Sequence, residues 1–184
     1  MVRFERQPPG TALTRSTLSM GALVAALAAW LVVAREPELG AVAALVSGVL
    51  LLAGGHRANH GAGGPTDRML DELLDRVWDG AVLGTAAWVA RNPDPEVALA
   101  SLAALCLSAL SAYVRARGAS LAYSVEESHL TRGLRYGLVV AGVGLGQAWA
   151  LWLAAAVSGL AVIVRTSQVA VEERTSQAAR DQRP

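Results

Sequence analysis

Four aspartates recur at four-residue intervals where the chain passes from a polar stretch into an apolar one: Asp67, Asp71, Asp75 and Asp79. Four residues is close to one helical turn, so a helix in this segment aligns the four carboxylates in a single stripe. Like charges in such a stripe repel each other unless a cation lies among them, and hard carboxylate oxygens favour Mg²⁺ or Mn²⁺ over zinc. The spacing therefore predicts a metal site or a carboxylate that acts as a general base.

A plainer interpretation is a solvated helix start, where the helix dipole favours acidic residues. It explains Asp67 and Asp71 well, because both precede the apolar segment. It explains Asp75 and Asp79 poorly, because they lead directly into that segment, where carboxylates are costly and usually functional. The free-energy cost of placing Asp75 and Asp79 in the membrane therefore favours the metal or catalytic interpretation.

The elements that must carry this stripe are apolar helices of membrane-spanning length. The chain of 184 residues is 53% hydrophobic and only 17% charged, with a mean hydropathy of +0.38, and no charged residue lies between Arg135 and Arg165. A span needs about 20 mostly apolar residues. The sequence predicts an all-α, polytopic membrane protein with six transmembrane helices and no nucleic-acid partner. The predicted spans lie near residues 16–34, 39–54, 70–90, 96–114, 131–145 and 147–164.

The breaks between the spans are marked by turn-forming residues. Pro37, Pro65 and the segment 92–95 (Asn-Pro-Asp-Pro) separate the first four spans. The last break rests on the glycines of 142–146 and on Gln147, within a run too long for one helix. Residues 1–170 are expected to form one membrane domain. Residues 171–184 are expected to be a polar cytoplasmic tail that frays into solvent.

The basic residues predict the orientation in the membrane. All 16 are arginines, and with six spans only Arg35 and Arg91 fall in loops on the side opposite the N-terminus. The positive-inside rule then places both termini in the cytoplasm and the polar face of the protein on the cytoplasmic side of the cell membrane.

The segment 70–76, Leu-Asp-Glu-Leu-Leu-Asp-Arg, followed by Asp79-Gly80-Ala81, resembles the second half of a known signature, D-x2-D-G-x2-A-R-x8-G-x3-D-x3-D. This signature belongs to the CDP-alcohol phosphatidyltransferases, six-span enzymes that transfer a phosphatidyl group from a CDP-linked lipid to an alcohol. The resemblance covers residues 12–170. It is closest to bacterial phosphatidylinositol-phosphate synthases, to which the segments 13–18 and 111–117, the pair Arg132 and Arg135, and Arg165 are also similar.

The resemblance implies roles for individual residues. Asp75 is the expected catalytic base, Asp71 and Asp75 are metal ligands for Mg²⁺ or Mn²⁺, and Gly54 matches the glycine of the signature at the site of the CDP group. The donor is CDP-diacylglycerol and the acceptor a polar alcohol phosphate such as inositol phosphate. The acceptor's phosphate is expected to bind a pocket formed by Arg115, Arg132, Arg135 and Arg165.

Arginine suits that pocket because its planar guanidinium binds phosphate oxygens in pairs. The alternative role for these arginines is at the membrane edge, where they extend to lipid headgroups and set the topology. The family also implies a homodimer, or pairing with a paralogue, in the lipid bilayer.

The chain departs from the signature in its first half. The spacing places the first two aspartates, which hold the metal in the family, on Leu50 and Ala53. The Ala-Arg pair is transposed to Arg57-Ala58, and the later glycine is Asp67. Substitute ligands are Asp67, one turn before Asp71, and the histidines His56 and His60, although His suits Zn²⁺ better than Mg²⁺.

Two hypotheses of function follow. The first is a phosphatidyltransferase of phospholipid biosynthesis with an altered metal site. The second is a catalytically silent member of the fold that serves as a lipid-binding or partner-binding subunit, for example of an active paralogue. Leu50 and Ala53 favour the second, whereas Asp71, Asp75 and the arginines favour retained binding.

Overall fold

The computed structural model describes residues 11–59, 64–121, 123 and 129–181. These residues form six α-helices and no strand. The helices are α1 (Thr11–Val33), α2 (Pro37–Asn59), α3 (Pro65–Ala90), α4 (Pro95–Ser120), α5 (His129–Leu145) and α6 (Ala148–Asp181). The predicted all-α fold is confirmed, and each predicted span lies on one helix.

Local sequence explains where the helices begin and break. α2, α3 and α4 each start with a proline, whose fixed φ suits the first helical position and whose missing N–H is not needed there. The carboxylate of Asp94 caps α4 by accepting a hydrogen bond from the Val97 amide at 3.2 Å. Gly146 separates α5 from α6 with a φ of +62°, which glycine adopts without a steric penalty. The predicted break in the last apolar run is therefore confirmed.

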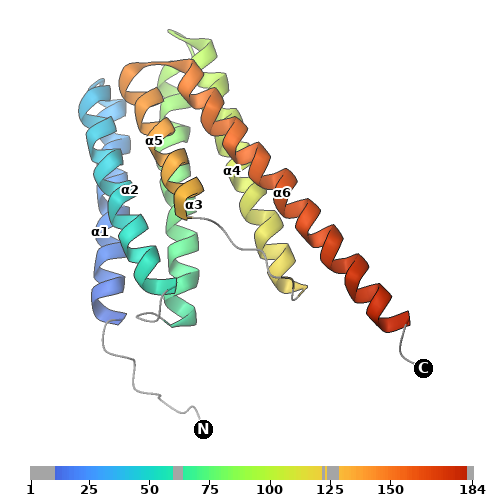
Figure 1. Cartoon of the computed structure of the whole chain (residues 1–184). Helices are drawn as coiled ribbons and strands as arrows, with labels where there is room; N and C mark the ends of the chain where they lie inside the picture. The colour runs from blue at the N-terminus through green and yellow to red at the C-terminus, as the bar shows by residue number, and fades with distance from the viewer. Residues whose placement is uncertain (1–10, 60–63, 122, 124–128, 182–184) are drawn as a thin grey trace.

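Successive helices run in alternating directions, so the start of α1 and the end of α6 lie at the same end of the structure (Figure 1). α1 packs against α2 and α3, α2 against α5, and α3 against α4. α6 packs against α4 and α5, and its C-terminal end points away from α1, α2 and α3 (Figure 1). α3 is thus central, in contact with α1, α2 and α4.

Four helical segments are long and apolar enough to cross a membrane: Ala12–Val33, Pro37–Ala58, Pro95–Ser120 and Ala148–Val171. Many of their large apolar side chains face outward, including Leu23, Trp30 and Ile163. A bilayer satisfies such surfaces, whereas water does not. The chain is a membrane-embedded protein. α3 contains the aspartate stripe and α5 has only 17 residues, so length and composition alone do not identify these two helices as spans.

The last helix is longer than the sequence analysis predicted. α6 continues through Asp181, so the segment 171–181 is helical and the expected fraying from residue 171 is wrong. This segment contains alanine, glutamate, glutamine and arginine and lacks both glycine and proline, so nothing in it ends a helix.

Candidate functional site

The four aspartates of α3 form the predicted stripe, and the stripe faces the interior. Asp67, Asp75 and Asp79 are at most 1% exposed and Asp71 is 3% exposed. A solvated helix start is therefore wrong even for Asp67 and Asp71. Buried carboxylates need partners, because an unpaired charge in a low-dielectric interior is very costly.

The partner of Asp71 is an arginine of α5. Nη1 and Nη2 of Arg132 donate to the two carboxylate oxygens of Asp71 at 2.9 and 3.0 Å. This paired geometry is the strongest that arginine offers a carboxylate. Nε of Arg132 also donates to Oδ1 of Asp75 at 3.0 Å, so one guanidinium joins two turns of the stripe.

Asp75 lies at the centre of the network. Nη2 of Arg135 contacts both of its oxygens at 3.0 Å, and Arg76 and the Tyr136 hydroxyl also donate to it. Trp78 packs beside Tyr136, with ring centroids 4.2 Å apart. Three guanidinium groups and one phenol therefore surround a single carboxylate, so this site is saturated with donors.

Asp79 and Asp67 end the stripe. Nη1 of Arg76 lies 2.9 Å from Oδ2 of Asp79, and the Ser108 hydroxyl donates to the same oxygen. At the other end, Nε of Arg15 donates to Oδ1 of Asp67 at 2.7 Å, and the Gly64 amide donates to Oδ2 at 2.8 Å. Four aspartates are thus matched by four arginines drawn from three helices.

Two adjacent glycines of α2, Gly54 and Gly55, serve different contacts. A Cβ on Gly54 would lie 2.7 Å from Leu18, so Gly54 permits close packing of α1 on α2. A Cβ on Gly55 would lie 2.5 Å from Oδ1 of Asp71, so Gly55 makes room for the Asp71–Arg132 pair. Gly54 was the predicted binding residue, but its neighbour Gly55 is the glycine that contacts the stripe.

The four arginines of the predicted phosphate pocket make different contacts. Arg132 and Arg135 bind the aspartates, whereas Nη1 of Arg165 donates to the Ser111 carbonyl at 3.0 Å. Nε of Arg115 lies 3.8 Å from Oε1 of Glu72 at the edge of a groove between α3 and α4. Among the described contacts, Arg132 and Arg135 therefore belong to the buried ion-pair network, and Arg135 and Arg165 also contact serines one turn apart on α4, Ser108 and Ser111.

A divalent cation does not fit the donor set of this site. Leu50 and Ala53 offer no ligand oxygen, and both oxygens of Asp71 are bound by Arg132. Within the described ranges, no three His, Cys, Asp or Glu side chains gather closely enough to hold a metal. Asp67, the substitute ligand, is bound by Arg15 instead, and His60 lies outside the described residues.

The sequence analysis missed several members of the network. Arg15 and Arg76 lie in segments compared with the family and Tyr136 follows Arg135, but no role was predicted for any of the three. Tyr136 follows Arg132 by four residues and so shares its helix face, which is the signal that would have identified it. Ser108 is one of several serines in the mostly apolar α4, and the sequence contains no signal that singles it out for contact with Asp79.

The comparisons with known proteins add no identification. No protein-family model, curated protein or solved structure matches the chain.

Gly55→Ala tests the close approach of α2 to the stripe. The added methyl group overlaps the Asp71 carboxylate and is expected to cost about 1–3 kcal/mol of unfolding free energy, as overpacking does elsewhere. Thermal unfolding in detergent measures the effect. Gly80→Ala is the matched control, because its methyl group would meet nothing within 4 Å, and it is expected to be neutral or slightly stabilising. An equal loss of stability in Gly55→Ala and Gly80→Ala would show that Gly55 is not needed for the close approach of α2 to Asp71.

A pH dependence is expected from Asp67, at the outer end of the stripe. Hydrogen bonds from Arg15 and from the Gly64 amide hold the pKa of Asp67 below its usual range. The stability that Asp67 contributes is therefore present above the pKa of an unfolded-chain aspartate, about 3.9, and is lost as the pH falls through the lower pKa of the folded state.

Asp67→Asn is expected to lower the unfolding temperature at pH 7, with a difference from the wild type that shrinks as the pH falls below about 4. Thermal unfolding between pH 3 and pH 7 measures this difference. A difference independent of pH would show that the charge of Asp67 contributes nothing to stability.

Proposed function

We propose that this chain is a catalytically silent membrane protein of the CDP-alcohol phosphatidyltransferase type, which retains a lipid-binding scaffold without metal-dependent phosphatidyl transfer. The observation that carries the proposal is the pairing of Arg132 with both oxygens of Asp71 and of Arg135 with both oxygens of Asp75. In the family, these aspartate positions hold a metal and the general base. Here the arginines that the resemblance assigns to a substrate phosphate occupy them.

The departures at Leu50 and Ala53 support the same conclusion. Leucine and alanine at these positions remove two metal ligands of the family. Arg132 and Arg135 neutralise the two carboxylates that remain, those of Asp71 and Asp75. Such a protein lies in the cell membrane with six spans and both termini in the cytoplasm. It serves as a lipid-binding or partner-binding subunit, as a homodimer or beside an active paralogue.

An active phosphatidyltransferase is the second candidate, and one observation favours it. Asp71, Asp75, Arg132 and Arg135 converge in one buried place, as residues of a phosphoryl-transfer site would. In that case, the arginines would have to leave the aspartates when CDP-diacylglycerol and a divalent cation bind. Asp75 would then accept the proton of the attacking hydroxyl as the oxygen–phosphorus bond forms and CMP leaves.

Phosphatidyl transfer by the full chain in lipid nanodiscs distinguishes the two functions. CDP-diacylglycerol is supplied with Mg²⁺ or Mn²⁺ and with inositol phosphate or glycerol phosphate, and CMP release is measured. No release is expected from the wild type. None is expected from the double variant Leu50→Asp/Ala53→Asp either, because Arg132 and Arg135 still bind Asp71 and Asp75. Metal-dependent CMP release from the folded wild type would overturn the silent function.

A further inference from the structure

Three exposed tryptophans lie at the end of the structure where α1 meets α2, α3 meets α4 and α5 meets α6. Trp30 is near the end of α1, Trp88 is near the end of α3, and Trp149 is at the start of α6. Because successive helices alternate in direction, these positions share one end of the structure, opposite the start of α1 (Figure 1). The three residues are 64%, 63% and 57% exposed, respectively. Together they form a tryptophan belt.

The chemistry of the belt fits the boundary between hydrocarbon and water. An indole ring is apolar, but its N–H group is a hydrogen-bond donor, so tryptophan is enriched at that boundary. The buried Trp78 donates its indole N–H to the Ala44 carbonyl at 3.3 Å. Among the described residues, none accepts a hydrogen bond from the belt tryptophans. Lipid ester carbonyls and interfacial water offer these three donors the acceptors that the protein does not.

The belt is not confined to one face of the structure. α1, which carries Trp30, and α6, which carries Trp149, lie on opposite sides (Figure 1). A protein docked on one face would cover one of these two residues and leave the other exposed. A bilayer interface surrounds the protein at one level and contacts both.

An arginine stands beside the belt. The guanidinium of the exposed Arg91 stacks on the Trp88 ring, 3.7 Å from the ring centroid, and donates to the Trp88 carbonyl. Lipid phosphates lie just outside the ester carbonyls, and guanidinium groups bind phosphate well. A cation held on the indole at this end of α3 is therefore placed for the headgroup layer.

The distance from the belt to the arginines at the other end of the structure matches the thickness of a bilayer. Twenty residues separate Trp88 from Arg68 on α3, and twenty separate Pro37, the first residue of α2, from Arg57. Twenty helical residues extend about 30 Å, which is also the thickness of a typical hydrocarbon core. The spacing indicates that α3 crosses the membrane, although its composition alone does not identify it as a span.

We propose that Trp30, Trp88 and Trp149 bind the interfacial layer of a phospholipid bilayer, at the membrane surface opposite the start of α1, and so fix the depth of the protein in the membrane. The inference goes beyond the proposed function. It holds whether or not the chain transfers phosphatidyl groups, because the belt contains no residue of the aspartate stripe.

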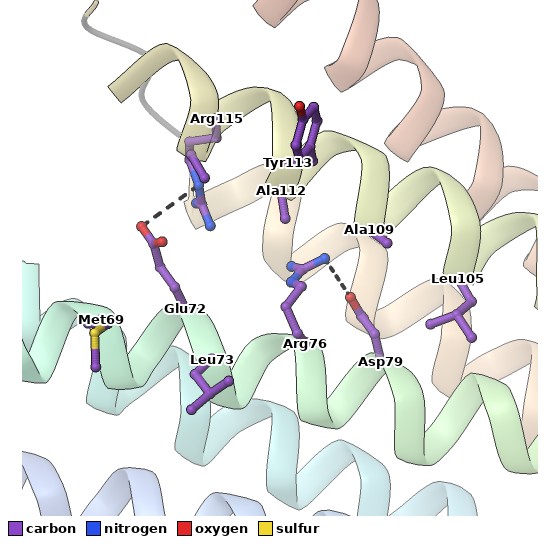
Figure 2. A pocket seen from close by; sticks show the side chains of 11 residues that line it. Met69, Glu72, Leu73, Arg76, Asp79, Leu105, Ala109, Ala112, Tyr113 and Arg115 are labelled. Atoms are coloured by element: carbon purple, nitrogen blue, oxygen red, sulfur yellow. Dashed lines mark ion pairs between the residues drawn. The ribbon is translucent and has the colours of Figure 1, made fainter. Parts of the chain in front are cut away.

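The belt also sets the depth of the stripe. Asp79, whose ion pair with Arg76 is drawn in Figure 2, precedes Trp88 by nine residues. Nine residues extend about 14 Å along a helix, so Asp79 lies near the bilayer centre. Asp67, three turns earlier on α3, lies at the opposite boundary. The stripe thus occupies the half of the bilayer next to the start of α1, and its nearest aqueous surface is on that side.

Fluorescence quenching by brominated phospholipids, in nanodiscs that contain the full chain, tests the proposal. Three variants each retain Trp78 and one belt tryptophan, with the other belt residues and Trp152 replaced by phenylalanine. A fourth variant retains Trp78 alone and gives the baseline, because Trp78 is fully buried. Bromine near the ester end of the acyl chains is expected to quench each belt tryptophan more than bromine near the terminal methyl group. Depth analysis is expected to place each ring about 15 Å from the bilayer centre.

Val77→Trp in the variant that retains Trp78 alone is the matched control. Val77 is exposed on α3, eleven residues before Trp88, so its substituted ring is expected about 16 Å deeper, near the bilayer centre. There, bromine near the terminal methyl group is expected to quench it most. Stronger quenching of Val77→Trp by bromine at the ester end would overturn the depth assigned to the stripe.

Two other outcomes would overturn the belt itself. Equal or stronger quenching of the belt tryptophans by bromine near the terminal methyl group would show that they lie in the bilayer core. Quenching by neither lipid above the Trp78 baseline would show that the belt does not contact lipid. Iodide in the buffer would then quench rings that face water but not rings covered by a second copy of the chain.

Discussion

Asp75→Asn is expected to destabilise the protein by about 3–5 kcal/mol, the cost of breaking a buried ion pair from one side. The neutral amide would remain among the guanidinium groups of Arg76, Arg132 and Arg135 and remove the charge that balances them. Its NH₂ group would also face donors, whereas both carboxylate oxygens of Asp75 accept hydrogen bonds. Chemical unfolding in detergent, monitored by tryptophan fluorescence, measures the loss of unfolding free energy.

Glu72→Gln is the control for this prediction, because Glu72 lies one turn from Asp75 on the same helix but is 54% exposed. It is expected to change stability by less than about 1 kcal/mol. A stable Asp75→Asn protein would show that the ion-pair network does not hold α3 to α5.

The Asp75→Asn result also affects how an activity assay is interpreted. The resemblance to the transferases suggests this variant as the natural test of a general base. A variant that loses the centre of the network loses activity whether or not Asp75 accepts a proton. Any assay of Asp75→Asn therefore needs a measurement of folding beside it.

Arg132→Ala is expected to cost a similar amount, about 3–5 kcal/mol. The substitution removes both hydrogen bonds to Asp71 and the one to Asp75, and it leaves the Asp71 carboxylate buried beside Gly55 without its guanidinium partner. Arg91→Ala is the control, because Arg91 is exposed, its guanidinium stacks on the Trp88 ring and it donates a hydrogen bond to the Trp88 carbonyl on the same helix turn.

A double-mutant cycle separates the ion pair from its surroundings. Asp71→Leu combined with Arg132→Met is expected to be more stable than Arg132→Met alone, because the double variant leaves no unpaired carboxylate at position 71. The expected coupling is about 1–3 kcal/mol, measured by chemical unfolding of the four proteins. Additive losses would show that Asp71 and Arg132 do not depend on each other.

The sequence by itself determined the helices and the stripe. Prolines at positions 37, 65 and 95 and the glycine at 146 mark boundaries through local backbone geometry, which needs no tertiary context. The four-residue spacing of the aspartates placed them on one helix face for the same reason. The three-residue spacing of Arg132 and Arg135 also predicted that both lie on one face of α5.

Only the tertiary structure decided what the stripe binds. A row of carboxylates attracts any cation, and its spacing predicted a metal ion because spacing alone does not distinguish a metal ion from a guanidinium group as the partner. Asp71 and Arg132 are 61 residues apart, and their contact depends on the packing of α3, α2 and α5. Local spacing contains no information about that packing. The groove between α3 and α4 has the same origin, because its acid and base lie on different helices and become neighbours only when the bundle forms.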